Sequence, residues 1–329
     1  MVDRDILLSY LEKQISIAEE RLKAYTVDAN GNKLRERFIL VRIKKLLDDY
    51  LEDKNIENRW VTIPSFRGTG KTTLLAQIYL TLIDKGIPRN RILYLSLDEV
   101  TKLLQSNLYE MINLYETLLG EAIESINEKT FLLIDEASYD KNWDITIKTI
   151  FDRTKNIFTI VTGSSSLLLQ SSADSARRKH IEKLFPLTFI EYMLLKKQLY
   201  PKRDLRTKIN DGLFSSKTAE EVYLTLDKLR GDINKYWSNI EPYEFERYLT
   251  KGTLPLALHL DKEYEVYERI IEILQRVIYE DIPLVDNYDK TTLDKIWNLL
   301  LILSESDTIS LESLSKKIDL EKPTVYKIL

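Results

Sequence analysis

The chain has 329 residues, which is enough for two domains with buried cores. It contains no cysteine and only two histidines, so a disulfide framework, a thiolate metal site, a cysteine nucleophile and a three-histidine zinc site are all excluded. Its 48 basic and 52 acidic residues give a net charge of −4, so the molecule as a whole has no general attraction for nucleic acid. Any DNA binding must therefore be local.

No apolar run reaches the roughly 18 residues that a membrane-spanning helix needs. The first residues, MVDRDILLSYLEKQ, place charges where a signal peptide would be apolar. We therefore expect a soluble, cytoplasmic protein with no membrane partner. The low content of glycine (9) and proline (8) predicts a mostly helical chain with few loops.

Residues 1–58 are expected to form a helical hairpin. Apolar residues recur at helical spacing over 6–18 and again over 38–51, and the run Asp28-Ala-Asn-Gly31 between them breaks the pattern.

From residue 59 onward the spacing of the apolar residues changes. Short apolar runs at 60–63, 91–97, 131–134 and 157–161 alternate with helical segments near 71–85, 107–127 and 142–154. Such a pattern is typical of parallel strands buried on both faces, so we expect an α/β core over 59–196.

After this core the strand signal fades. Residues 202–210 are a polar, charged stretch suited to a linker or an exposed loop, and 217–290 are amphipathic helix. We interpret 197–290 as one helical unit and 291–329 as a second.

The strongest motif is the run Ile63-Pro-Ser-Phe-Arg-Gly-Thr-Gly-Lys-Thr-Thr-Leu74 between a strand and a helix, the context of a phosphate-binding loop. Its two glycines let backbone amides approach phosphate oxygens, and the helix directs its positive end at the same anion. Lys71 would reach the β and γ phosphates, and the Thr72 hydroxyl would bind Mg²⁺. We predict a nucleotide site at Arg67, Gly68, Thr69, Gly70, Lys71, Thr72 and Thr73. The usual motif opens with glycine, and we expect Ser65 to restrict the loop at that position.

A second motif, Phe131-Leu-Leu-Ile-Asp-Glu136, places two carboxylates at the end of a buried strand. The first, Asp135, is expected to hold Mg²⁺, and the second, Glu136, to take a proton from the attacking water. This pair favours hydrolysis over phosphoryl transfer to a small molecule.

Two further runs are candidates for the same site. The strand 157–161 is followed by hydroxyls, and Thr162 or Ser164 could contact the γ-phosphate or the attacking water; a simple Gly-Ser turn is the alternative. Beyond it, Arg177 and Arg178 could neutralise charge on a transferring phosphoryl group, an effect of about 10³ to 10⁵ in rate. A solvated basic turn is the alternative here.

The stretch from 59 to about 196 resembles the AAA+ superfamily, and within it a prokaryotic archaeal-ATPase-like branch. The resemblance rests on the loop 65–74, on Leu132-Leu-Ile-Asp-Glu-Ala137, on Thr162-Gly-Ser-Ser165, and on Leu184-Phe-Pro-Leu-Thr-Phe-Ile-Glu191 with Arg178 six residues before it; the run 251–255 matches more weakly. It implies a five-stranded parallel sheet in the order 5-1-4-3-2, a helical lid, ATP–Mg²⁺ between them and a C-terminal winged helix. It implies no particular substrate. The absence of an Asn-Lys-x-Asp motif favours ATP over GTP.

The last segment, 309–329, reads as helix, short turn, helix, which is the spacing of a helix-turn-helix. In a DNA-binding version, Thr324, Tyr326 and Lys327 would face the major groove. The chain stops within this helix, so we expect the helix-turn-helix domain to be incomplete. Three functions stay open: an ATP-hydrolysing motor or remodeller, acting on or near DNA or as a homo-oligomer; a slow nucleotide-dependent switch; and a DNA-binding regulator with little turnover.

Overall fold

A computed structural model describes residues 3–28, 30–164, 172, 174–258, 260 and 262–328. Within these residues, five parallel strands form one sheet in the order β2-β3-β4-β1-β5, which confirms the expected 5-1-4-3-2 order. The strands are β1 (Trp60–Pro64), β2 (Ile92–Ser96), β3 (Thr130–Asp135), β4 (Ile157–Gly163) and β5 (His180–Ile181). The protein therefore has the phosphate-loop NTPase fold.

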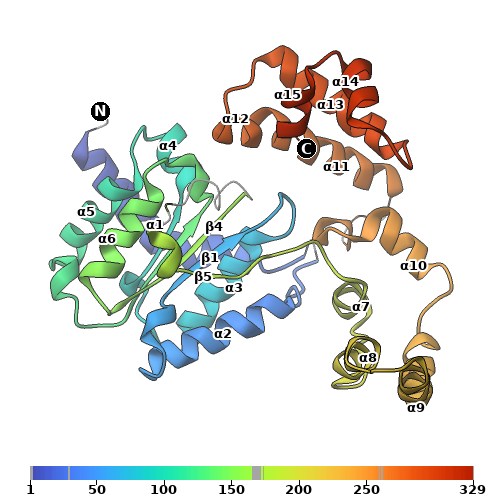
Figure 1. Ribbon diagram of the computed structural model, residues 1–329. Coiled ribbons are helices and arrows are strands. Elements are labelled where there is room, and N and C mark those ends of the chain that lie inside the picture. Colours follow the sequence, from blue (N-terminus) through green and yellow to red (C-terminus); the bar gives the residue numbers. More distant parts are fainter. Residues whose placement is uncertain are drawn as a thin grey trace.

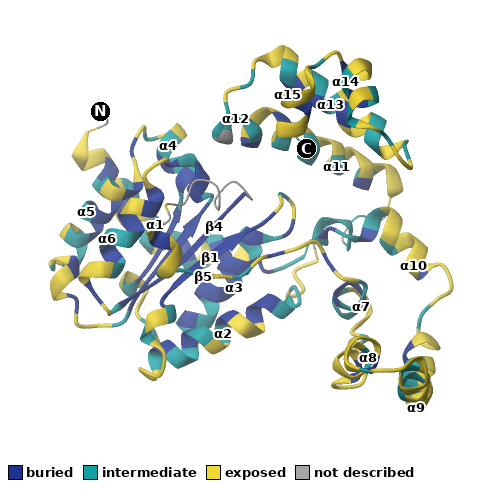
Figure 2. Ribbon diagram, viewed as in Figure 1, coloured by how far each residue is buried: buried dark blue, intermediate teal, exposed yellow. Residues whose placement is uncertain are grey.

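The sheet is buried on both faces because successive side chains along each strand point to opposite sides. On one face, Leu93, Leu132 and Val161 pack with α5 (Leu108–Leu119) and α6 (Trp143–Arg153). On the other face, Ile92, Leu133 and other strand residues pack with α2 (Phe38–Leu51) and α3 (Lys71–Asp84). Figure 2 shows the strands as the most continuously buried part of the molecule.

The two helices expected over 1–58 are present as α1 (Arg4–Ala24) and α2, but they pack mainly on the core. The first half of α1 contributes Leu7 and Leu11 to one apolar cluster, and its second half contributes Ala18 and Leu22 to the other. The helix therefore lies along the β2 edge of the sheet and contacts α3 and α5. Both apolar faces are used by the core, which is why a helical hairpin does not form.

Short helices lie between the strands and longer helices of the core: η1 (Ile56–Asn58), η2 (Arg89–Arg91), α4 (Leu97–Lys102), η3 (Ile123–Ser125), η4 (Ala137–Tyr139) and η6 (Ser175–Arg177). After β5 the described residues form helices, namely α7 (Phe189–Lys197), α8 (Leu205–Phe214), α9 (Ala219–Trp237), α10 (Glu244–Arg247), η7 (Tyr248–Gly252), η8 (Pro255–Leu258), α11 (Glu263–Arg276), η9 (Val277–Asp281), α12 (Ile282–Val285), α13 (Lys290–Ser304), α14 (Leu311–Ile318) and α15 (Lys322–Ile328).

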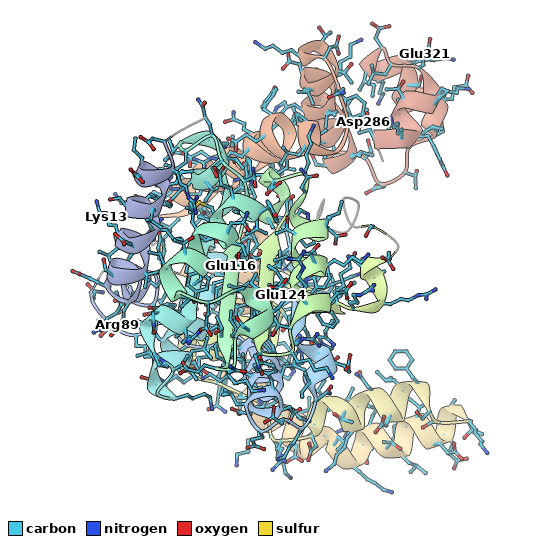
Figure 3. All side chains as sticks on the ribbon, turned by 90° about the vertical axis from the view of Figure 1, so that its left-hand side faces the viewer. Lys13, Arg89, Glu116, Glu124, Asp286 and Glu321 are labelled. Carbon is cyan, nitrogen blue, oxygen red and sulfur yellow. The ribbon has the colours of Figure 1, made fainter. Side chains whose placement is uncertain are left out.

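The helical half divides into two parts that lie on different sides of the core (Figure 1). Helices α8 and α9 contact each other and project as a mostly exposed pair. Helices α13 to α15 pack around Leu299, Leu314 and Val325. Figure 3 shows this last unit, with Asp286 and Glu321 labelled, standing apart from the sheet. None of the described helices is long and apolar enough to cross a membrane.

Candidate nucleotide-binding site

The phosphate loop connects β1 to α3. Gly68 and Gly70 have φ of 79° and 90°, a backbone region that L side chains rarely adopt. A Cβ on Gly68 would also lie 2.7 Å from Ile273 Cδ1, so a side chain at this position would displace Ile273 on α11. Gly70 is the N-cap of α3, and the first amides of that helix have no intrahelical acceptor. The loop therefore provides the backbone donors and the helix end that bind an anion.

Ser65 does not restrict the loop as expected. It is absent from the described residues with positive φ, so serine causes no backbone strain where the usual motif has glycine. The Thr69 hydroxyl lies 3.0 Å from Ser65 Oγ and donates to the Phe66 carbonyl at 2.8 Å. Thr69 is fully buried, so its side chain supports the loop from within.

The two predicted metal-binding side chains come together. The Thr72 hydroxyl donates to Asp135 Oδ2 at 2.7 Å, and Thr162 donates to the other carboxylate oxygen, Oδ1. Tyr94 on β2 also donates to Asp135 Oδ2, at 3.3 Å. Thr162 therefore orients the carboxylate in this structure. Ser164 is buried just after β4, and Ser165 lies outside the described residues.

Glu136 follows β3 directly and has φ of 51°, the left-handed region that costs energy for a residue with a Cβ. Its Oε1 lies 3.5 Å from Lys71 Nζ, and the Lys71 side chain is only 5% exposed. Burial raises the pKa of Glu136 above the usual range of a glutamate, and the nearby Lys71 ammonium partly opposes this rise. A carboxylate with a raised pKa beside the phosphate loop is suited to act as a general base.

Arg67, at the tip of the loop, is held by the helical half. Its guanidinium donates to both oxygens of Asp281 on η9, at 2.9 Å (Nε) and 2.7 Å (Nη2). The same Nη2 lies 2.9 Å from Tyr139 Oη and 3.2 Å from Glu280 Oε2. The loop is therefore connected to the segment that follows α11.

Arg177 and Arg178 are not brought to the phosphate loop of their own chain. Arg178 donates to Asp152 at 2.7 Å and also pairs with Asp174. Because His180 is opposite Val61 in the sheet, Arg178 lies level with Arg59, six residues before Ser65. At about 3.3 Å per strand residue, this is about 20 Å from the start of the loop. Arg178 lies at the other end of the sheet because β4 and β5 are parallel, so the chain between them returns to the end where β1 starts.

A cavity of about 510 Å³ lies over the phosphate loop. The core contributes the loop residues Arg67 to Leu74 except Thr69, together with Gln77 and Glu136. The segment before α2 contributes Leu34, Arg35 and Arg37. The helical half contributes Leu195, the run 255–258 without Ala257, and four residues of α11, namely Arg269, Glu272, Ile273 and Arg276. The volume falls within the range of small-molecule sites.

The residues fit a bound nucleotide with Mg²⁺. The glycine loop and the start of α3 can hold phosphates, and Thr72 and Asp135 supply the oxygen ligands that Mg²⁺ prefers. In the described part of the chain, no group of three or more His, Cys, Asp or Glu side chains could hold a metal. The ion would therefore depend on Thr72, Asp135, water and phosphate oxygens together.

Comparisons with known proteins agree with this geometry. Residues 57–193 match a protein family described as "AAA domain". This segment is therefore similar to that family. An uncharacterized protein of Methanocaldococcus jannaschii is 38% identical over 302 residues, which cover 91% of this chain and 59% of that protein. One of Haemophilus influenzae is 27% identical over 155 residues, covering 46% and 36% of the two chains. The chain therefore spans less than two thirds of these relatives.

Among solved structures, AMPPCP-bound DnaA from Aquifex aeolicus covers 86% of both chains at 17% identity with a TM-score of 0.30. A RuvB mutant of Thermotoga maritima covers 87% of this chain and 84% of its own at 16% identity with a TM-score of 0.33. TM-scores this low do not support any comparison of fold or function. The fold assignment depends instead on the sheet order and the loop.

Several residues that line or adjoin the cavity over the phosphate loop were not predicted. Arg269 and Arg276 bring two cations to it from α11, and Asp281 binds the loop arginine. Arg37 also lines the cavity and contacts the phosphate loop. Their only sequence signal is a charged residue in an otherwise ordinary helical or linker segment, and nothing in that signal shows that it lies at the nucleotide site.

Proposed function

We propose that the chain binds ATP with Mg²⁺ in the cavity over the phosphate loop and hydrolyses it to drive a conformational change of its helical half. The observation that carries this proposal is the convergence of Lys71, Thr72, Asp135 and Glu136 at one end of the sheet, under a cavity of about 510 Å³. Nucleotide-dependent activity is also what AAA domains have in common.

Each residue has a separate role in this proposal. Lys71 and the amides at the start of α3 bind the β and γ phosphates. Thr72 and Asp135 hold the metal, which neutralises charge that develops on the phosphates. Glu136 accepts a proton from the attacking water, so it must separate from the Lys71 ammonium before it can act.

The conformational change follows from the contacts above the loop. The cavity is closed on one side by the loop and on the other by α11, and Arg67 binds Asp281 at the end of η9, the helical segment that follows α11. A phosphate that binds between the two parts therefore changes the contacts that hold them together. We propose the domain boundaries that the sequence predicts: 59–196 is the ATPase core, 197–290 is the lid and 291–329 is the helix-turn-helix unit.

The experiment combines two variants with calorimetry and a phosphate-release assay. Lys71→Ala removes the cation that binds the phosphates, so we expect no measurable ATP binding. Glu136→Gln keeps the side-chain size and removes the base, so we expect ATP binding with hydrolysis lowered by about 10²-fold or more. Unchanged ATP affinity in Lys71→Ala would contradict the site. A parent that binds ATP but releases no phosphate is instead the slow switch.

We also propose that the C-terminal unit contacts DNA. Helices α14 and α15 follow each other through a turn at Asp319, and Tyr326 on α15 is 76% exposed. Lys327, however, is bound to Asp286, so the net positive charge of this surface is small. Double-stranded DNA affinity should therefore be weak and should fall as salt is raised. Affinity that is absent at low salt would leave the unit with protein contacts only.

A further inference from the structure

The segment before α2 reaches the phosphate loop through one buried arginine. Arg37 is the N-cap of α2, and its guanidinium Nη1 donates to the Thr69 carbonyl at 2.8 Å. Its Nη2 also donates to the Phe185 carbonyl at 2.9 Å. The side chain is 11% exposed, so these bonds are made largely away from water.

Glu191 fixes the orientation of this guanidinium. Arg37 Nε donates to Glu191 Oε1 at 3.0 Å and Nη2 donates to Oε2 at 2.7 Å, which is a bidentate pair. The Phe38 amide donates to Oε1 as well, at 3.1 Å. Glu191 is buried and ends the run 184–191, a motif that the catalytic residues do not explain.

The consequence for the loop follows from peptide geometry. In a trans peptide the C=O and N–H point in opposite directions, so a fixed Thr69 carbonyl also fixes the Gly70 N–H. Gly70 has φ of 90° and no Cβ, so this peptide would otherwise rotate easily. A rotated peptide would present a carbonyl oxygen to the phosphates in place of a donor. A charged donor on the carbonyl also strengthens the N–H as a donor.

We propose that Arg37, held by Glu191, is a positioning residue that orients the Thr69–Gly70 peptide so that the loop can bind polyphosphate. This rests on the proposed function, because it concerns the same site. It also gives a role to the segment before the sheet: the entry to α2 completes the phosphate loop across 32 residues of sequence.

The test measures the affinities of three probes by calorimetry: ATP, inorganic tripolyphosphate and adenosine. Arg37→Ala should weaken ATP and tripolyphosphate binding by about 10- to 100-fold, the effect of a hydrogen bond to a charged group, while adenosine affinity stays within about twofold. Arg37→Lys should recover only part of this loss, because an ammonium cannot bind Glu191 in a bidentate manner and also reach Thr69. Arg42→Ala is the control, since it removes an Arg–Glu pair between the same helix and Glu182 but leaves the contacts to the loop in place; Arg42 is 53% exposed, so this pair is the weaker of the two.

Glu191→Gln separates positioning from direct contact, because Glu191 does not line the cavity whereas Arg37 does. If Arg37 only attracted the phosphates directly, removing its counter-charge would tighten ATP binding. If Arg37 positions the loop, the same change weakens ATP binding by several-fold and adds little to Arg37→Ala, because the two residues act as a unit.

Three results would overturn the positioning role: tighter ATP binding in Glu191→Gln, an equal loss of adenosine and ATP affinity in Arg37→Ala, or the same effect in Arg42→Ala. If Arg37→Ala does not fold, as judged by thermal melting, Arg37→Lys and Glu191→Gln give the same comparison. A parent chain that binds neither ATP nor tripolyphosphate would instead contradict the proposed function itself.

Discussion

The contact between Arg67 and Asp281 should control how firmly the helical half closes on the phosphate loop. The pair is bidentate, and the two side chains are only 14% and 11% exposed. Asp281 is the last residue of η9, which continues directly from α11, and α11 carries Ile273 over Gly68. Loosening this pair should therefore release α11 from the loop without disturbing the sheet, so Asp281→Asn is the perturbation of choice.

The size of the effect follows from burial. Removing one partner of a buried ion pair costs about 3–5 kcal/mol, and asparagine keeps one acceptor for the guanidinium. We therefore expect Asp281→Asn to destabilise the closed arrangement by about 2–3 kcal/mol. At 1.4 kcal/mol per factor of ten, this changes the ratio of closed to open chains by about 30- to 150-fold.

Hydrogen exchange followed by mass spectrometry measures this ratio directly. Amides of α11 and η9 should exchange faster in Asp281→Asn by about the same factor, whereas amides of β3 and β4 should be unchanged. The adjacent Glu280 provides the control, because its carboxylate is 42% exposed and bonds to the same guanidinium at 3.2 Å. Glu280→Gln should change exchange by less than about fivefold. Equal exchange of α11 in the two variants would refute the reasoning.

Two further predictions concern ionisation. Burial raises the pKa of Glu136, and the side chain acts as a base only after it has lost its proton. The hydrolysis rate should therefore fall on the acid side at a higher pH than an ordinary glutamate would give. A rate that is half-maximal at the pKa of an ordinary glutamate would contradict this. Burial alone would raise the pKa of Glu244, but hydrogen bonds from Lys196 and Tyr192 outweigh it and lower the pKa to about 2. Because the pKa of Glu244 is lower in the folded chain than in the unfolded chain, its carboxylate stabilises the fold at any pH above the unfolded-state pKa. This stabilisation is lost as the pH falls towards 2. Glu244→Gln should thus lower the free energy of unfolding by about 3 kcal/mol at pH 7 and by almost nothing at pH 2 in denaturant titrations; an equal loss at both values would contradict the ionic explanation.

The sequence predicts the core because the core's signals are local. The loop 63–74 and the pair Asp135-Glu136 each lie within one short run of sequence. Each run shows both where a strand ends and which functional side chains follow it. Thr162 lies in β4, the strand next to β1, and is opposite Ile63 in the sheet, as the predicted strand order requires. Helix ends were predicted less well. The helix expected over 107–127 stops at Leu119, because Gly120 takes φ of 71° and caps it.

The rest of the site depends on contacts between residues far apart in the chain. Arg37 and Glu191 are 154 residues apart, and Arg67 and Asp281 are 214 apart. No local pattern distinguishes these charged residues from those on a solvated surface. Glu136 shows the same limit in another way, since its left-handed backbone and its ion pair with Lys71 appear only once the strand and the helix are packed together. Sequence therefore identifies the reacting groups, and packing identifies the groups that orient them.

Arg178 shows how the position of a predicted residue changes the prediction. It lies about 20 Å from the start of its own phosphate loop, level with Arg59 at the opposite end of the sheet. It also belongs to the segment that enters β5, the edge strand, and its side chain is 28% exposed. An arginine in this place can reach ATP only on a neighbouring copy of the chain. We therefore expect it to act in trans within a homo-oligomer.

Mixing experiments test this expectation. Specific ATPase activity should rise with protein concentration, and a mixture of Arg178→Ala chains with Lys71→Ala chains should recover turnover, since each chain supplies what the other lacks. Flat activity per chain together with no recovery on mixing would contradict a role in trans. Full activity in the Arg177→Ala, Arg178→Ala double variant would show that this turn takes no part in hydrolysis. In that case the bonds from Arg178 to Asp152 and Asp174 are its whole role, holding the entry to β5 against α6.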